Sequence, residues 1–214
     1  MNIIIKQVLL VFSFLIPISV LIYFYKLGSL RRITISQFIG SFIIGGFGSA
    51  LLAMKIPDLF IVAGESYNWN CLRVFLVIFE EVIKILVTAL LIQYLKQKSV
   101  LEGIRIGAAV GSGFTFIETM VYATKAYSLF REAEVVMDVI IYRNVFSPCN
   151  HVVWNAIIGA AIILCMHYKK YGYCCMFLLC VLVHAMCNWY SLTWAHIIWG
   201  LAMWIILFSL IEED

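Results

Sequence analysis

Charged residues are scarce in this 214-residue chain. Asp, Glu, Lys and Arg make up 13% of it, against roughly 25% in soluble domains, while hydrophobic residues make up 64%. The mean hydropathy of +1.01 argues against an ordinary soluble domain. We therefore predict an all-α fold, a polytopic transmembrane helical bundle. The net charge of +3 is too small and too scattered to indicate nucleic-acid binding.

The sequence also lacks the local motifs of several hydrolase classes. It has no HExxH, the usual metalloprotease spacing, and no GxSxG, the motif around the nucleophile of many serine hydrolases. Seven cysteines are present, but none forms a CxxC pair and most lie in apolar runs. Cysteine in such runs is usually a small buried hydrophobe, so disulfides and cysteine-metal clusters are not expected.

Windows of about 20 apolar residues predict seven membrane-spanning helices. They cover residues 8–27, 34–54, 72–95, 101–122, 146–166, 173–190 and 194–211. No connection between them is long enough for a soluble domain. Residues 1–214 are therefore expected to form a single integral-membrane domain.

Lysine and arginine concentrate in alternate connections between these spans. The basic connections contain Lys26, Arg31, Arg32, Lys96, Lys98, Lys169 and Lys170. Because basic loops tend to stay in the cytoplasm, this alternation places the N-terminus outside and the C-terminus inside. We expect a multi-pass protein of the cell membrane, specifically of a bacterial plasma membrane.

The connection at residues 129–141 differs from the others. Leu129, Val136 and Ile140 follow helical spacing, and charged residues lie between them. This pattern favours an amphipathic helix in the outer interface of the membrane. Ordinary packing of a loop explains it equally well.

The third predicted span carries Glu80, Glu81 and Lys84 within an apolar segment. A charged residue at the centre of a membrane helix costs about 2.5–3.5 kcal/mol on insertion scales, so these residues are functional candidates. Lys84 follows the two glutamates at i+4 and i+3, and it can neutralise one of them. The other glutamate needs a partner from another span. The alternative is a cluster that only fixes helix packing.

The fourth span combines small residues with a carboxylate. Gly103, Gly107 and Gly111 form a double GxxxG pattern, which is typical of closely packed membrane helices. At 100° per residue, Glu118 lies about 20° from Gly107 and Gly111. Glu118 is therefore expected to face the bundle and not the lipid.

The fifth and sixth spans each carry a histidine followed by an asparagine at i+4. These pairs are His151 with Asn155 and His184 with Asn188. The predicted topology places both histidines in the outer third of the membrane, at the depth expected for the glutamates of the third and fourth spans. The sequence therefore predicts one water-accessible pocket that opens on the extracytoplasmic side.

Glutamates, histidines and amide side chains together can hydrolyse an amide bond. A glutamate can take a proton from water, a histidine can orient the water, and an amide can stabilise the oxyanion. Two alternatives stay open for such a set of residues. Glu118, His151 and His184 could bind zinc, or the chain could be a proton- or cation-coupled transporter.

Four motifs, in this order along residues 73–190, resemble those of the PrsW family of intramembrane proteases. They are EEVIK at 80–84, FTFIE at 114–118, His151 with the upstream Arg143 and Pro148, and HAMCN at 184–188. This family is related to the CAAX-prenyl-protease and bacteriocin-processing (CPBP) proteins. At position 188, where PrsW proteins usually have Asp, this chain has Asn, and CPBP relatives have Asn at the matching position. An asparagine side chain favours a role as an oxyanion donor.

The resemblance implies an endopeptidase that cleaves membrane proteins near the extracytoplasmic face, with site-1-type cleavage of a single-pass anti-sigma factor as the expected reaction. It implies Glu80, Glu81, His151 and His184 as catalytic residues. Lys84, Glu118, Arg143, Asn155 and Asn188 are the expected supporting residues. We favour a metal-free glutamate mechanism over a zinc-dependent one. A non-catalytic CPBP-like binding or immunity protein is a further alternative.

Overall fold

The computed structural model describes residues 3–27, 33–61, 69–143, 150–189 and 193–212, and within these ranges the chain is helical and has no strand. The predicted all-α fold is therefore confirmed. The helices are α1 (Ile3–Lys26), α2 (Ile35–Gly40), η1 (Ser41–Phe47), α3 (Gly48–Ile61), α4 (Trp69–Tyr94), α5 (Val100–Phe130), α6 (Ala133–Ile141), α7 (Asn150–Met166), η3 (Tyr171–Cys174), α8 (Cys175–Trp189) and α9 (Thr193–Ile211).

Helical segments fall on each of the predicted spans. Among the described residues, Ile35–Lys55, Val100–Phe130 and Tyr171–Trp189 are long and apolar enough to cross a membrane. Asn150–Met166 and His196–Ile211 are apolar but shorter. The number of seven spans and the outside position of the N-terminus stay predictions. Pro148 and the rest of the stretch 146–149, which open the predicted fifth span, lie outside the described residues.

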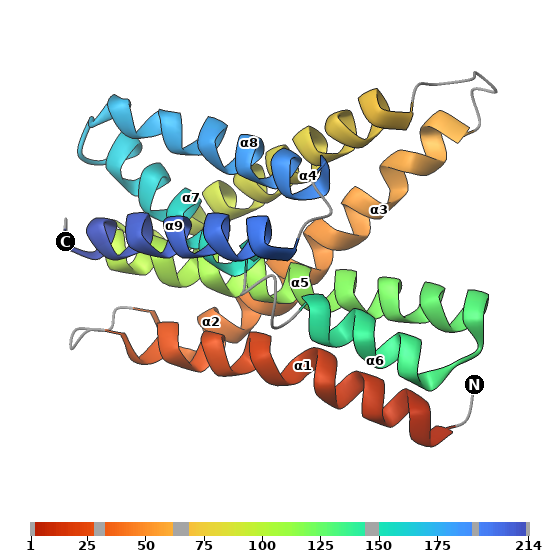
Figure 1. The fold of residues 1–214 in the computed structure, drawn as a ribbon. Helices are drawn as coiled ribbons and strands as arrows, with labels where there is room; N and C mark the ends of the chain where they lie inside the picture. The colour runs from red at the N-terminus through yellow and green to blue at the C-terminus, as the bar shows by residue number, and fades with distance from the viewer. Residues whose placement is uncertain (1–2, 28–32, 62–68, 144–149, 190–192, 213–214) are drawn as a thin grey trace.

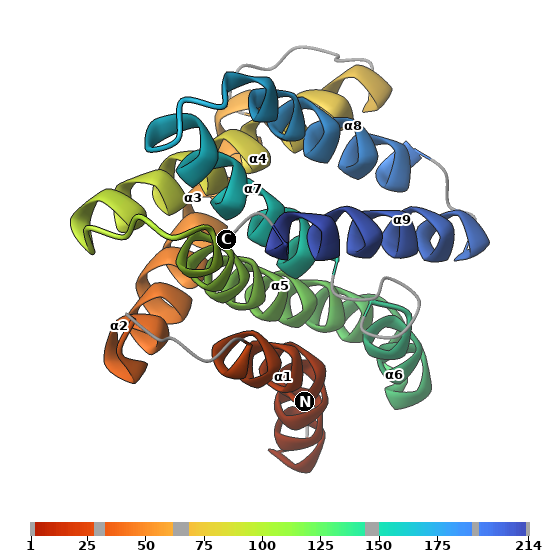
Figure 2. The same cartoon turned by 90° about the vertical axis from the view of Figure 1, so that its left-hand side faces the viewer.

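Helix α5 forms the centre of the bundle. It runs between α1 on one side and α7 and α9 on the other (Figure 1), and Figure 2 shows the same arrangement from a second direction. Its residues 102–116 are all buried. It packs most extensively against α7, and then against η1 and α1.

Two glycines of α5 allow α7 to approach at backbone contact. A Cβ atom added at Gly107 would overlap the carbonyl group of Asn155, and one added at Gly111 would overlap that of His151. The predicted GxxxG pattern therefore marks the α5–α7 crossing, where small residues let two backbones touch. Because His151 lies on this crossing, the same contact sets its position relative to α5.

Helix α6 starts later than the helix predicted for residues 129–141. Helix α5 continues through Phe130 and ends where Arg131 adopts a left-handed conformation with a φ of 62°. Glu132 is extended, and α6 begins at Ala133. Val136 and Ile140 of α6 are buried in an apolar cluster with residues of α5. A helix is therefore present in most of the predicted range, and its place in the membrane interface stays a prediction.

Replacing Gly107 by alanine tests the close α5–α7 crossing. We expect Gly107→Ala to lower the free energy of unfolding by about 1–3 kcal/mol, because the new methyl group forces the two backbones apart. Gly48→Ala is the matched control, since an added Cβ there meets nothing within 4 Å. Denaturant unfolding in detergent micelles measures both variants, and equal unfolding midpoints for the two would contradict the crossing.

Candidate functional site

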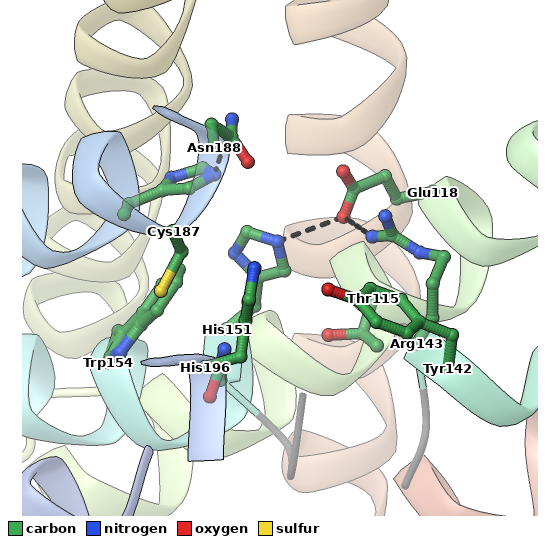
Figure 3. Close-up of a pocket in the computed structure, with 11 residues that line it drawn as sticks. Thr115, Glu118, Tyr142, Arg143, His151, Trp154, Cys187, Asn188 and His196 are labelled. Carbon is green, nitrogen blue, oxygen red and sulfur yellow. Dashed lines mark hydrogen bonds and ion pairs between the residues drawn. The ribbon is translucent and has the colours of Figure 1, made fainter. Parts of the chain in front are cut away.

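Five ionisable side chains from four helices meet inside the bundle. Glu80 and Glu81 come from α4, Glu118 from α5, His151 from α7 and His184 from α8. The structure thus brings together the glutamates and histidines that the sequence suggested. Figure 3 shows the part of this cluster around Glu118 and His151.

Lys84 lies at the centre of the cluster and is completely buried, as is Glu81. Its ammonium group donates to Glu81 Oε1 at 2.6 Å and to His151 Nδ1 at 3.0 Å. It also lies 4.5 Å above the centre of the Phe114 ring, within the range of a cation–π interaction. Lys84 therefore connects α4 to both α5 and α7.

The contacts of His151 assign its tautomer. An ammonium group can only donate, so Nδ1 of His151 accepts the hydrogen bond from Lys84. The neutral ring then carries its proton on Nε2, which lies 2.9 Å from Glu118 Oε2. Glu118 also forms an ion pair with Arg143 at 2.5 Å. Both contacts of Glu118 are drawn in Figure 3.

His184 is oriented in the same way. Its Nδ1 lies 2.6 Å from Glu81 Oε1, and because a carboxylate only accepts, this nitrogen carries the proton. The Nε2 atom is then an acceptor, and Nδ2 of Asn188 lies 3.4 Å from it. These contacts form a hydrogen-bonded network around the two histidines. In each of the contacts of His151 and His184 described above, donor and acceptor are assigned.

Glu80 differs from the other two glutamates. Its side chain is 27% exposed, and its Oε2 atom lies 3.9 Å from His184 Nε2. This distance is too long for a direct hydrogen bond. Glu81 and Glu118 each pair with a lysine or arginine, and within the described part of the chain Glu80 does not.

Two cavities border the cluster. The smaller, of about 240 Å³, is lined by Glu118 of α5, by both histidines and other residues of α7 to α9, and by Tyr142 and Arg143, which follow α6. The larger, of about 580 Å³, is lined mainly by apolar residues of α3, α4 and α5, together with the charged residues Lys55, Glu80, Glu118 and Lys125. The cluster therefore lies between a polar cavity and a mainly apolar one, and both cavities reach Glu118.

A protein-family model described as PrsW family intramembrane metalloprotease matches residues 34–211. The chain belongs to the PrsW family. No curated protein and no solved structure matches it. The match confirms the resemblance seen in the motifs and extends beyond residues 73–190 in both directions. A PrsW protein is a membrane-embedded protease, a hydrolase that acts on membrane-protein substrates.

The word metalloprotease in the PrsW family description raises the question of whether these residues fit a metal ion. Among the described residues, Glu81, His151 and His184 form a group whose ligand atoms lie within 4.8 Å of one another. This group differs from the zinc ligands suggested by the sequence, since Glu81 takes the place of Glu118. Two histidines and a glutamate are a donor set that suits zinc. Glu81 Oε2 is buried without a hydrogen-bond partner and could serve as a ligand.

The position of Lys84 argues against a metal ion in this arrangement. Tetrahedral zinc binds its ligands at about 2.0–2.2 Å, which places the ligand atoms about 3.4 Å apart. The Lys84 ammonium group already binds two of the three ligands, Glu81 and His151. In the alternative set with Glu118, Arg143 pairs with that carboxylate. The donor types therefore fit zinc, but Lys84 and Arg143 already contact the residues that would hold it.

Asn155 is the one predicted supporting residue that lies outside the network. Its amide donates to Thr88 Oγ1 and to the carbonyl oxygen of Gly107, both at 3.0 Å. It therefore joins α7 to α4 and to α5, one helical turn along α7 from His151. Lys84, Glu118, Arg143 and Asn188, the other supporting candidates, all contact the network.

Several residues of the polar cavity were not predicted, among them Trp154 and His196. The Trp154 ring lies 5.0 Å from that of His151 and 4.9 Å from that of His184, so it packs against both histidines. His196 of α9 also lines the cavity. Trp154 stands at i+3 from His151, and His196 is a polar residue in an apolar span. Two arguments used for the other residues could have found them: helical spacing for Trp154, and for His196 the expectation that a polar residue in a membrane helix is functional.

The two asparagines of the His-xxx-Asn pairs should differ in their effect on stability. Asn155→Ala is expected to lower the free energy of unfolding by about 1–3 kcal/mol, because it leaves buried polar partners without a donor. Asn188→Ala should change it by less than about 0.5 kcal/mol, because Asn188 is exposed. Thermal or denaturant unfolding in micelles checks this, and the reverse order would contradict the assignment of Asn155 to packing.

Proposed function

We propose that this chain is an endopeptidase that hydrolyses peptide bonds of membrane proteins, with Glu80 as its general base. The observation that carries the proposal is the lack of a lysine or arginine partner for Glu80 among the described residues, beside two glutamates that each have one. A carboxylate held by a cation is a poor base. Glu80 keeps its acceptor oxygens for water.

Accessibility supports the same choice. Glu81 is completely buried, and its Oε1 atom is already shared by Lys84 and His184. Glu80 borders the larger cavity, which has room for a polypeptide segment. The two adjacent glutamates therefore receive different roles: Glu81 holds the network together, and Glu80 acts on the substrate.

The gap of 3.9 Å between Glu80 Oε2 and His184 Nε2 suits a bridging water molecule. Both atoms can accept a hydrogen bond, and a water that donates to each would replace the long contact of 3.4 Å between the Asn188 amide and His184 Nε2. Glu80 takes a proton from this water while the water oxygen attacks the peptide carbonyl carbon. When the tetrahedral intermediate collapses, the carbon–nitrogen bond breaks and the proton passes from Glu80 to the leaving nitrogen.

The oxyanion of that intermediate needs donors that are free to point into the cavity. The amide of Asn188 and the guanidinium group of Arg143 both line the polar cavity. Each has further N–H donors beyond those in its contact with His184 or Glu118. His151 is a weaker candidate, because both of its ring nitrogens already have partners. We therefore assign His151 to positioning and keep His184 as the histidine that contacts the attacking water.

The two cavities support a division between substrate and water. The apolar cavity suits a segment of a membrane protein that enters between α3, α4 and α5, and the polar cavity suits water. The distribution of basic residues favours an opening toward the extracytoplasmic side of a bacterial plasma membrane. A single-pass anti-sigma factor is the substrate type that the family resemblance suggests.

Replacing each of the adjacent glutamates by glutamine tests the assignment of the base. Glu80→Gln should reduce cleavage of a labelled single-pass membrane protein by roughly 10²–10⁴-fold, because the amide cannot accept the proton. The fold should be unaffected. Glu81→Gln should instead lower the free energy of unfolding by about 3–5 kcal/mol, because it leaves Lys84 without its buried counter-ion. Cleavage and unfolding are measured on the same preparations, and wild-type cleavage by Glu80→Gln would refute the proposal.

Chelator treatment tests the metal-free mechanism separately. Cleavage by purified protein in micelles should be unchanged after incubation with a zinc chelator, because the network already contains its cations in Lys84 and Arg143. A zincin-type soluble protease in the same buffer serves as the positive control. Loss of cleavage that added zinc restores would show that the reaction needs a metal.

A further inference from the structure

We propose that Lys84 is the resident cation of the Glu81–His151–His184 cluster and that it keeps divalent metal ions out. The inference concerns which cation occupies the cluster, so it goes beyond the proposed reaction. It starts from the burial of Lys84. A lysine inside a membrane helix usually extends its charge toward water, whereas the Lys84 side chain is completely buried.

The contacts of Lys84 explain why its charge stays in the bundle. Glu81 supplies a counter-ion at 2.6 Å, His151 supplies an acceptor at 3.0 Å, and the Phe114 ring lies 4.5 Å from the ammonium nitrogen. These partners come from three different helices. The site is therefore built around an ammonium group, with a counter-charge, a neutral acceptor and an aromatic face.

The same contacts conflict with a metal ion. A zinc ion ligated by Glu81 and by Nδ1 of His151 would lie about 2.0–2.2 Å from each ligand atom. It would compete with the ammonium group for Nδ1 of His151 and for the negative charge of Glu81, whose Oε1 atom lies 2.6 Å from the Lys84 nitrogen. The like charges of the two cations would also repel each other in a setting with little screening by water. Only one of the two cations can occupy the cluster at a time.

The cluster has little freedom to widen and hold both cations. The carbonyl group of His151 lies against Gly111 at the α5–α7 crossing, which holds this part of α7 next to α5. Trp154 packs against the rings of both histidines. Lys84 is three residues after Glu81 on the same helix, so their pairing does not depend on movement between helices.

Removal of the Lys84 ammonium group should therefore create a metal site. Lys84→Met keeps an unbranched apolar side chain of similar length and leaves the three ligands in place. Glu81 would then have both carboxylate oxygens free of lysine, and Nδ1 of His151 would be available as a ligand. Zinc would supply the positive charge that the variant lacks.

The experiment measures zinc retained by the purified full-length chain in detergent, with zinc as the only added probe and no substrate. Each protein is incubated with zinc, passed through a desalting column and analysed for metal content. Lys84→Met should retain about one more zinc per chain than the wild type. The Lys84→Met/His184→Ala double variant should lose that zinc. Addition of zinc should raise the thermal unfolding midpoint of Lys84→Met and leave that of the wild type unchanged.

Two lysine variants serve as controls. Lys84→Arg keeps a cation in the cluster and should retain no more zinc than the wild type. Lys125→Met removes one positive charge from an exposed position on α5 and should also match the wild type. A gain of zinc in Lys125→Met equal to that in Lys84→Met would overturn the inference, because it would trace the effect to net charge.

Two other results would also overturn it. The first is a folded Lys84→Met variant that retains no additional zinc. The second is a wild-type protein that already retains zinc and loses it on His184→Ala substitution. This second comparison does not depend on the folding of Lys84→Met, and equal zinc content in the wild type and His184→Ala supports the inference. Because metal content is read without a substrate, the result is independent of whether Glu80 is the catalytic base.

Discussion

A buried charge in an apolar helical bundle must have a partner, and the ion pair of Glu81 and Lys84 meets this requirement inside α4. Both side chains are completely buried. Loss of either partner would leave an uncompensated charge, which is far more costly than the absence of both. The pair also orders its surroundings: Glu81 fixes the ring of His184, and Lys84 fixes that of His151. The other polar contacts of the site extend from these two histidines.

The same constraint separates the residues that hold the site from those available for chemistry. Arg143 neutralises Glu118 as Lys84 neutralises Glu81. Glu80 stands beside a cavity without such a partner among the described residues. The cost of burying charges is thus offset pair by pair. Glu80 and Glu118 both border this cavity, and of these two carboxylates Glu118 is the one held by an arginine. This arrangement supports a glutamate base in a PrsW protein.

Much of the fold could be predicted from the sequence because a membrane allows few backbone arrangements. Long apolar runs without strand-like alternation indicate helices, and each predicted range is helical over most of its described residues. Boundaries were less predictable. Helix α5 continues through Phe130 because only the left-handed conformation of Arg131 ends it, and nothing in the hydropathy pattern marks that residue. The role of Asn155 was also beyond the sequence, since its partners Thr88 and Gly107 lie on other helices.

By itself, the sequence determined that this protein is a helical membrane protein, that polar residues stand in four of its helices, and that their order is that of the PrsW family. These properties depend on local composition and spacing. Only the tertiary structure decided which carboxylate pairs with which cation. Glu81 and His184 are 103 residues apart, and Lys84 and His151 are 67 apart. Such pairings depend on how the helices cross, and the crossing of α5 and α7 depends on backbone contact at glycines. The distinction between Glu80 and Glu81, adjacent in the sequence, follows from that packing.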